Sequence, residues 1–163
     1  MMIKTEQPAS YFVVANVKKE DLAIKKALKI LESRLTIKEH FFTNPEDTEN
    51  YLKIKLADLG HEEFHCLFLD SQHGLIKHEC LFTGTIDGAS VYPREVLKKA
   101  LQYNAAALIF AHNHPSGNCA PSQADISITK KLKECAALFD IRVLDHIIVG
   151  GVSAYSLAQN GGM

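Results

Sequence analysis

One unbroken apolar run constrains the fold of this chain more than any other feature. Residues 105–111 read AAALIFA and lie between turn-forming residues. A strand with one exposed face alternates apolar and polar residues, whereas a strand that is apolar throughout is covered on both faces. The run therefore predicts a central strand in a sheet that carries helices on both sides.

The segments around this strand predict an alternation of helices and further strands. Asn44 and Pro45 are typical of the start of a helix, and Gly60 is typical of its end. Two more helices are expected, one that begins at Pro93 and one over residues 123–139. The apolar faces of the first and third helices are expected to include Leu52, Ile54, Leu132 and Phe139. Further strands are expected at residues 64–69, 75–85, 142–149 and 154–157. This alternation is typical of an α/β fold, a three-layer α/β/α sandwich with a mixed sheet.

The N-terminal part predicts a separate element. From Lys18 onwards apolar residues recur at helical spacing through Leu28, Leu31 and Leu35, and charged residues occupy the other positions. This pattern indicates an amphipathic helix with a solvated charged face rather than a nucleic-acid contact. We expect residues 1–43 to form an N-terminal arm and helix, and residues 44–163 to form the main domain.

Charge and cysteine content narrow the class of protein. The 163 residues include 18 Lys and Arg against 19 Asp and Glu, a formal net charge of −1, which disfavours a surface built to bind nucleic acid. The four cysteines are irregularly spaced, and the first residues contain no apolar core of a signal peptide. No apolar run is long enough for a membrane helix. We therefore expect reduced thiols in a cytoplasmic protein without a membrane partner.

The segment after the apolar run carries the chemistry. His112 and His114 are two residues apart at the end of a strand, so their side chains project from the same face and can hold one metal ion. Ser122 is a typical N-cap of the next helix, and Asp125 then lies in its first turn, free to face the end of the strand. Two imidazoles and one carboxylate leave a fourth position for water, the pattern of catalytic zinc.

The wider pattern resembles two nested families. H-x-H-P, six residues and then S-x-x-D resembles the JAMM (MPN-plus) metalloprotease motif. The segment AHNHPSGNCAPSQAD, with LFLDSQHGLI before it and LDHIIVG after it, resembles the bacterial RadC family over residues 44–158. The resemblance implies a cytidine-deaminase-like α/β/α fold and one zinc ion bound by His112, His114 and Asp125. Full-length RadC-like proteins carry an additional N-terminal helix-hairpin-helix region, so this chain resembles the short forms.

The same resemblance implies two further site residues. JAMM enzymes use a glutamate at the start of an early strand as general base, and the acid two residues before Phe64 is Glu62. Glu63 remains the alternative, because a shift of one residue turns a strand side chain to the opposite face. The hydroxyl of Ser122 either caps its helix or donates to the oxyanion of the tetrahedral intermediate.

Residues 61–65, HEEFH, also match the H-E-x-x-H pattern of zincin proteases. That site needs both histidines on one turn of a helix. Gly60 and the β-rich run that follows predict a strand here, so the zincin interpretation is disfavoured. Among the other histidines, His73 and His78 are expected to be solvated, and His146 is expected to make a buried structural hydrogen bond.

The function implied by the resemblance is zinc-dependent hydrolysis of peptide or isopeptide bonds in a peptide or protein substrate. Zinc makes hydroxide available at neutral pH, and Glu62 takes the proton from the water and delivers it to the leaving amine. Two alternatives remain open, a non-catalytic interaction module stabilised by its metal and a DNA-repair-associated factor. Nucleobase deamination is disfavoured, because the chain lacks the H-x-E and P-C-x-x-C pattern.

Overall fold

A computed structural model describes residues 19–27, 41–84 and 90–163. The chain divides into two units, Met1–Ile37 and Lys38–Met163, and each is described by itself. In the first unit, residues 19–27 form a helix with exposed side chains. The predicted apolar positions Leu28, Leu31 and Leu35 lie outside the described residues.

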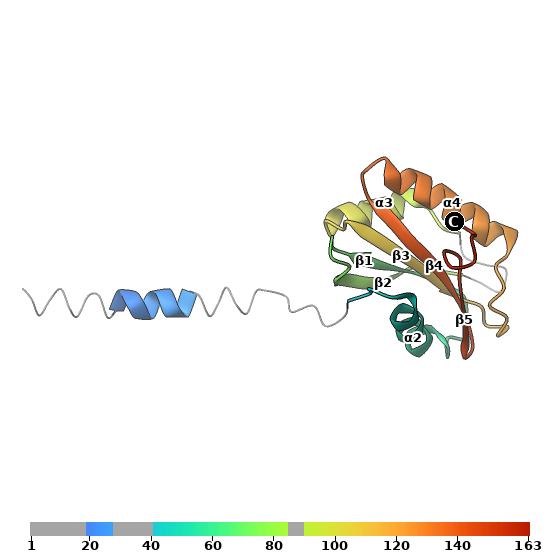
Figure 1. Cartoon of the computed structure of the whole chain (residues 1–163), viewed down its shortest axis with the longest axis horizontal. Helices are drawn as coiled ribbons and strands as arrows, with labels where there is room; N and C mark the ends of the chain where they lie inside the picture. Colours follow the sequence, from blue (N-terminus) through green and yellow to red (C-terminus); the bar gives the residue numbers. More distant parts are fainter. Residues whose placement is uncertain (1–18, 28–40, 85–89) are drawn as a thin grey trace, which may run out of the picture. The chain divides into compact units, whose positions relative to one another are not determined.

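The second unit is built on a five-stranded sheet (Figure 1). Its strands are β1 (Glu63–Leu69), β2 (Leu75–Thr83), β3 (Ala107–Asn113), β4 (Arg142–Gly150) and β5 (Ser153–Ser156), in the order β2-β1-β3-β4-β5. β3 and β4 pair in parallel, and the other neighbours pair antiparallel. The central strand β3 is buried along its whole length, as its apolar sequence predicted. It begins at Ala107, two residues later than expected, and continues through His112 and Asn113.

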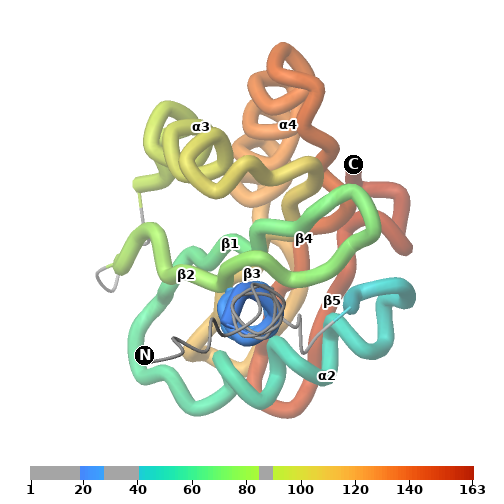
Figure 2. Tube along the Cα trace, turned by 90° about the vertical axis from the view of Figure 1, so that its left-hand side faces the viewer, coloured from blue at the N-terminus to red at the C-terminus, as the bar shows by residue number. Residues whose placement is uncertain are grey.

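Helices cover both faces of this sheet. The three in this unit are α2 (Pro45–Leu56), α3 (Pro93–Gln102) and α4 (Gln123–Ala137). Figure 2 shows α3 and α4 on one side of the strands and α2 on the other. A separate apolar core fills each interface, around Phe68, Phe110 and Leu132 on the α3–α4 side and around Leu52, Leu67 and Ile147 on the α2 side. The predicted three-layer α/β/α sandwich with a mixed sheet is therefore confirmed.

Two helix ends differ from the sequence prediction. α2 starts as expected, since the Asn44 side chain accepts a hydrogen bond from the Asp47 N–H at 2.9 Å. It ends at Leu56 rather than near Gly60, and Ile54 is 84% exposed. α4 ends at Ala137, because Asp140 adopts a left-handed conformation and the Ile141 N–H bonds to the carbonyl of Ala136. The chain thus leaves the helix before Phe139, which is half exposed instead of buried.

Candidate metal centre

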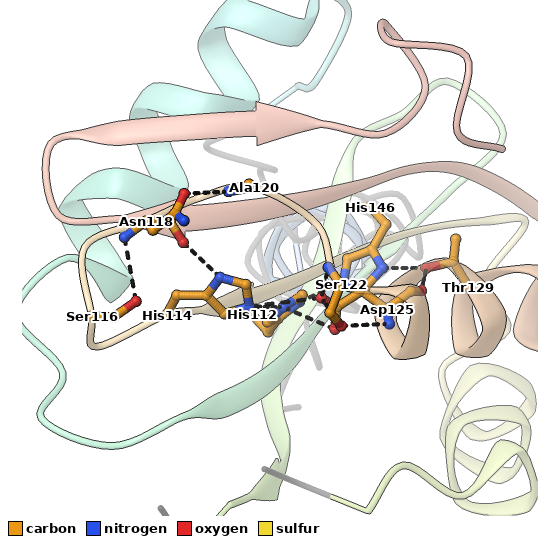
Figure 3. Close-up of polar contacts among 9 residues, drawn as sticks. All are labelled: His112, His114, Ser116, Asn118, Ala120, Ser122, Asp125, Thr129 and His146. Atoms are coloured by element: carbon orange, nitrogen blue, oxygen red, sulfur yellow. Dashed lines mark hydrogen bonds and ion pairs between the residues drawn. The ribbon is translucent and has the colours of Figure 1, made fainter. Parts of the chain in front are cut away.

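Strand β3 and the first turn of α4 bring His112, His114 and Asp125 together (Figure 3). The two Nε2 atoms lie 2.9 Å apart. Nε2 of His112 is 3.3 Å from Oδ1 of Asp125, and Nε2 of His114 is 3.7 Å from Oδ2. His112 is 1% exposed and His114 is half-buried, so the cluster lies where the buried strand reaches the surface. The three residues predicted as ligands are thus neighbours in space.

A hydrogen-bond chain determines which nitrogen of His112 carries hydrogen. The Thr129 hydroxyl donates to the backbone carbonyl of Asp125, so its oxygen accepts from Nδ1 of His146. Complete burial lowers the pKa of His146 well below its ordinary value and keeps the ring neutral. Its Nε2 therefore accepts from Nδ1 of His112 at 2.8 Å, which leaves Nε2 of His112 with a free lone pair.

The loop after β3 gives His114 the same tautomer by a different route. Nδ1 of His114 lies 2.7 Å from the backbone carbonyl oxygen of Asn118, which can only accept. Nδ1 therefore carries a hydrogen, so the tautomer of the ring that can bind a metal does so through Nε2. Both histidines thus direct their Nε2 atoms at the carboxylate of Asp125.

The donor set fits a zinc ion. Tetrahedral zinc lies about 2.0 Å from nitrogen and oxygen ligands, which separates two such ligands by about 3.3 Å. The three separations here, 2.9, 3.3 and 3.7 Å, bracket that value. Each histidine also donates its second ring nitrogen to a protein acceptor, an arrangement that orients metal ligands in known sites. His112, His114 and Asp125 could therefore hold one zinc ion.

Ser122 holds the Asp125 carboxylate in place. The Ser122 hydroxyl accepts from the Asp125 N–H at 3.1 Å and donates to Oδ2 at 2.7 Å, and the Ser122 N–H donates to the same oxygen at 2.7 Å. Burial by itself would raise the pKa of Asp125, but the contacts of its carboxylate with His112 and Ser122 outweigh the effect of burial and hold the pKa well below its usual value. The predicted capping box is thus present, and its hydroxyl is bonded to the carboxylate.

Glu63 is the first residue of β1, and Glu62 precedes the strand. Phe64 pairs with His112 across β1 and β3, and Glu62 lies two residues before Phe64, just ahead of β1. Strand alternation, extended from Phe64 to Glu62, predicts that the Glu62 side chain lies on the face of Phe64 and His112. The Glu63 carboxylate points to the other face, where it contacts Nε2 of His61 and Nε2 of His65, each at 2.8 Å.

Asn113 clamps the backbone on both sides of Glu62. Its side chain points away from the metal cluster, because successive side chains of a strand alternate between the two faces of the sheet. Its Oδ1 accepts from the Glu63 N–H at 2.8 Å, and its Nδ2 donates to the carbonyls of His61 and Leu59 at 2.8 and 3.3 Å. Asn113 thereby ties the entry of β1 to the end of β3.

The loop that supports His114 rests directly on the end of β4. A Cβ at Gly150 would lie 2.6 Å from the carbonyl oxygen of Gly117 and 2.7 Å from the backbone nitrogen of Cys119. The His114 N–H also donates to the carbonyl of Val149 at 2.8 Å. Only glycine at position 150 allows this close approach.

Several histidine predictions can now be compared with the structure. His65 lies in strand β1, so the H-E-x-x-H segment is not helical and the zincin interpretation is excluded as predicted. The buried hydrogen bond expected for His146 is present. The prediction that His78 is solvated is wrong, because the ring packs between β1 and α2 and bonds to Tyr51 and His65. The sequence prediction also missed Thr129, although its spacing of four residues from Asp125 places both on one helix face.

Comparisons with known proteins agree with this geometry. A family model described as RadC-like JAB domain matches residues 42–162. The chain belongs to the RadC family. This RadC-like chain is 51% identical to a UPF0758 protein of Vibrio cholerae over 96% of its own length and 98% of that relative. It is 50% identical to the UPF0758 protein YfjY of Escherichia coli, over 85% and 86% of the two chains.

Other relatives of the RadC-like chain are longer. It is 58% identical to a UPF0758 protein of Azotobacter vinelandii over 72% of its own length, but it spans only 53% of that relative. JAB-like domains include metal-dependent hydrolases, which agrees with the metal-binding geometry of His112, His114 and Asp125. Within residues 19–27, 41–84 and 90–163, no helix has the length and apolar character needed to span a membrane.

Proposed function

We propose that this RadC-like protein is a zinc-dependent hydrolase that cleaves a peptide or isopeptide bond in a protein substrate. His112, His114 and Asp125 would hold one zinc ion and leave a fourth position for water. The observation that carries this proposal is the convergence of the Nε2 atoms of His112 and His114 and the Asp125 carboxylate at the end of a buried strand. Without a cation, three electron-rich groups at this spacing would repel one another.

The residues around the ion have separate tasks in this proposal. When bound, zinc lowers the pKa of its water far enough to make hydroxide available at neutral pH, and it polarises the substrate carbonyl. Glu62 takes the proton at its carboxylate and returns it to the leaving amine. The contacts of Glu63 support this role for Glu62, because the Glu63 carboxylate bonds to His61 and His65 on the other side of the sheet.

Ser122 acts through Asp125 in this proposal. Its hydroxyl donates to Oδ2 of Asp125, so donation to a substrate oxyanion would require that bond to break. The proposed compartment is the cytoplasm, since all four cysteines are free, which is typical of a reducing environment.

Metal analysis and peptide cleavage test the proposal together. We expect the wild type to bind zinc in the cluster and to cleave members of a library of peptides and lysine isopeptides. Glu62→Gln should keep the zinc of this cluster and lose cleavage, whereas His112→Ala should lose both the zinc of this cluster and cleavage. Glu46→Gln is a matched control, because Glu46 is exposed in the first turn of α2 on the other side of the sheet.

Two results would contradict the proposal. Equal zinc content in wild type and His112→Ala would show that His112 is not a zinc ligand. Undiminished cleavage in Glu62→Gln would show that Glu62 is not the general base. Zinc binding without cleavage of any library member would instead support a non-catalytic interaction module.

A further inference from the structure

A second group of metal-binding side chains lies on the α2 side of β1. The carboxylate of Glu63, the imidazole of His65 and the thiol of Cys80 present ligand atoms that all lie within 4.8 Å of one another. His65 and Cys80 are paired across β1 and β2, so their side chains share a face. Glu63 joins them because it is two residues from His65 on the same strand.

The charge states of Glu63 and His65 suit a cation, whereas Cys80 must lose its proton to bind one. Burial by itself would raise the pKa of Glu63, but hydrogen bonds from Cys80, His65 and His61 outweigh it and keep the carboxylate charged. Burial is the largest effect on His65 and lowers its pKa, so the ring is neutral. Burial and the nearby Glu63 charge raise the pKa of Cys80, and a cation between them would remove that repulsion.

A chain of hydrogen bonds, called the relay below, holds the ring of His65 at the nitrogen that faces away from Glu63. Its Nδ1 lies 3.1 Å from Nε2 of His78, and Nδ1 of His78 lies 3.0 Å from the hydroxyl of Tyr51. Metal-ligating histidines generally donate their second ring nitrogen to such a partner.

This relay can run in two directions. In the metal-free chain, the Tyr51 hydroxyl donates to His78, His78 donates to His65, and Nε2 of His65 donates to Glu63. When Nε2 binds a cation, the hydrogen moves to Nδ1 of His65 and donates to His78, and Nδ1 of His78 then donates to the Tyr51 oxygen. Both imidazoles stay neutral throughout, so metal binding buries no additional ring charge.

We propose that Glu63, His65 and Cys80 form a second metal site that takes a divalent cation of the zinc type. A mixed set of oxygen, nitrogen and sulfur suits zinc, whereas calcium and magnesium prefer oxygen ligands alone. Binding releases one proton from the Cys80 thiol to solvent, and the sulfur coordinates as thiolate. Nε2 of His61, 2.8 Å from the other Glu63 oxygen, is a candidate for the fourth position. The site does not depend on the proposed hydrolase activity, because it shares no ligand with the first centre.

Sulfur makes this site spectroscopically distinct from the first. The His112–His114–Asp125 cluster contains no thiol, so a thiolate-to-cobalt charge-transfer band can arise only where a cysteine coordinates. We expect the full-length wild type, loaded with Co²⁺, to show this near-ultraviolet band, and the His112→Ala variant to retain it. Cys80→Ser should abolish the band, and His65→Gln should weaken cobalt binding at this site at least 10-fold.

Matched cysteine variants complete the experiment. Cys119 lies in the loop beside the first centre and Cys135 lies in α4, and Cys119→Ser and Cys135→Ser should both keep the band. Cys80 is exposed on β2, so its replacement should leave the thermal unfolding temperature close to that of the wild type. No band in the wild type, or a band that survives in Cys80→Ser, would overturn the proposal.

Discussion

Nδ1 of His112 donates to Nε2 of His146 across the parallel strands β3 and β4, at a distance of 2.8 Å. His146 is fully buried, and the rings of Phe64 and Phe110 pack edge-on against it, with centroids 5.4 and 6.0 Å away. In these apolar surroundings a hydrogen bond is strong and an unpaired polar atom is costly. The contact therefore orients His112 for metal binding from the strand behind it.

Replacement of His146 by Phe should weaken zinc binding without unfolding the protein. The substitution keeps an aromatic ring in an aromatic pocket but leaves the Nδ1–H of His112 without an acceptor. Loss of such a supporting partner typically lowers metal affinity by about 10–100-fold. Competition with a chromophoric chelator measures this change, and an unchanged affinity in His146→Phe would contradict the role assigned to the contact.

Thr129→Val should also lower zinc affinity, but by less than His146→Phe does. The methyl group keeps the shape of the side chain but removes the acceptor for Nδ1 of His146. Ser127→Ala is the matched control on the same helix, because the Ser127 hydroxyl bonds only to the carbonyl of Gln123 among the contacts described, and it is exposed. The same chelator assay should separate the two variants, and equal losses in both would point to a general effect on α4.

Asn113→Ala should reduce turnover while leaving zinc bound. The substitution removes the amide that holds the backbone of His61 and Glu63, and with it the position of Glu62. A displacement of about 1 Å at a catalytic group can cost about 100-fold in rate. Zinc content and kcat measured on the same sample check this prediction. A higher KM with an unchanged kcat would show that Asn113 does not position the general base.

Ser122→Ala should affect both stability and metal binding. Loss of an N-cap typically costs about 1 kcal/mol, and here it also frees the Asp125 carboxylate to turn away from the two histidines. Asn44→Ala removes the corresponding cap of α2 and should cost a similar amount of stability. Denaturant unfolding and zinc titration together should distinguish them, since only Ser122→Ala should lower zinc affinity.

Gly150→Ala should loosen the loop that supports His114. The new Cβ would lie 2.6 Å from the carbonyl oxygen of Gly117, so the loop must move and carry the Asn118 carbonyl away from Nδ1 of His114. Overpacking of this kind typically costs about 1–3 kcal/mol. Gly60→Ala is the control, because a Cβ there meets no atom within 4 Å. Thermal unfolding and zinc affinity close to wild type in Gly150→Ala would refute the prediction.

Leu52→Ala should destabilise the domain strongly, whereas Ile54→Ala should not. Both residues lie on α2, but Leu52 is fully buried against the sheet and Ile54 is 84% exposed. Truncation of a buried leucine typically costs about 2–5 kcal/mol, and an exposed substitution changes stability by less than about 0.5 kcal/mol. Urea unfolding of the two variants measures the difference.

At three positions, Ile54, Phe139 and His78, the exposure of the side chain differs from what the sequence pattern predicted. Ile54 is exposed because it lies inside α2 but away from the buried face of Leu52 and Leu56, and Phe139 is half exposed because α4 ends before it, at Ala137. At the end of α2, the Asn113 amide bonds to the carbonyl of Leu59 and draws the chain towards β1. His78 was expected in solvent because nothing in its local sequence indicates that α2 packs over it.

By itself, the sequence determined the α/β sandwich and predicted that His112, His114 and Asp125 would lie together. Those inferences rest on local regularities, namely strand alternation, an unbroken apolar run and a capping box within four residues. Only the tertiary structure decided which ring nitrogens carry hydrogen, which face Glu63 occupies and how Glu63, His65 and Cys80 meet. These relationships join residues far apart in the chain, 34 positions between His112 and His146 and 50 between Glu63 and Asn113, and strand pairing alone brings them within hydrogen-bonding distance.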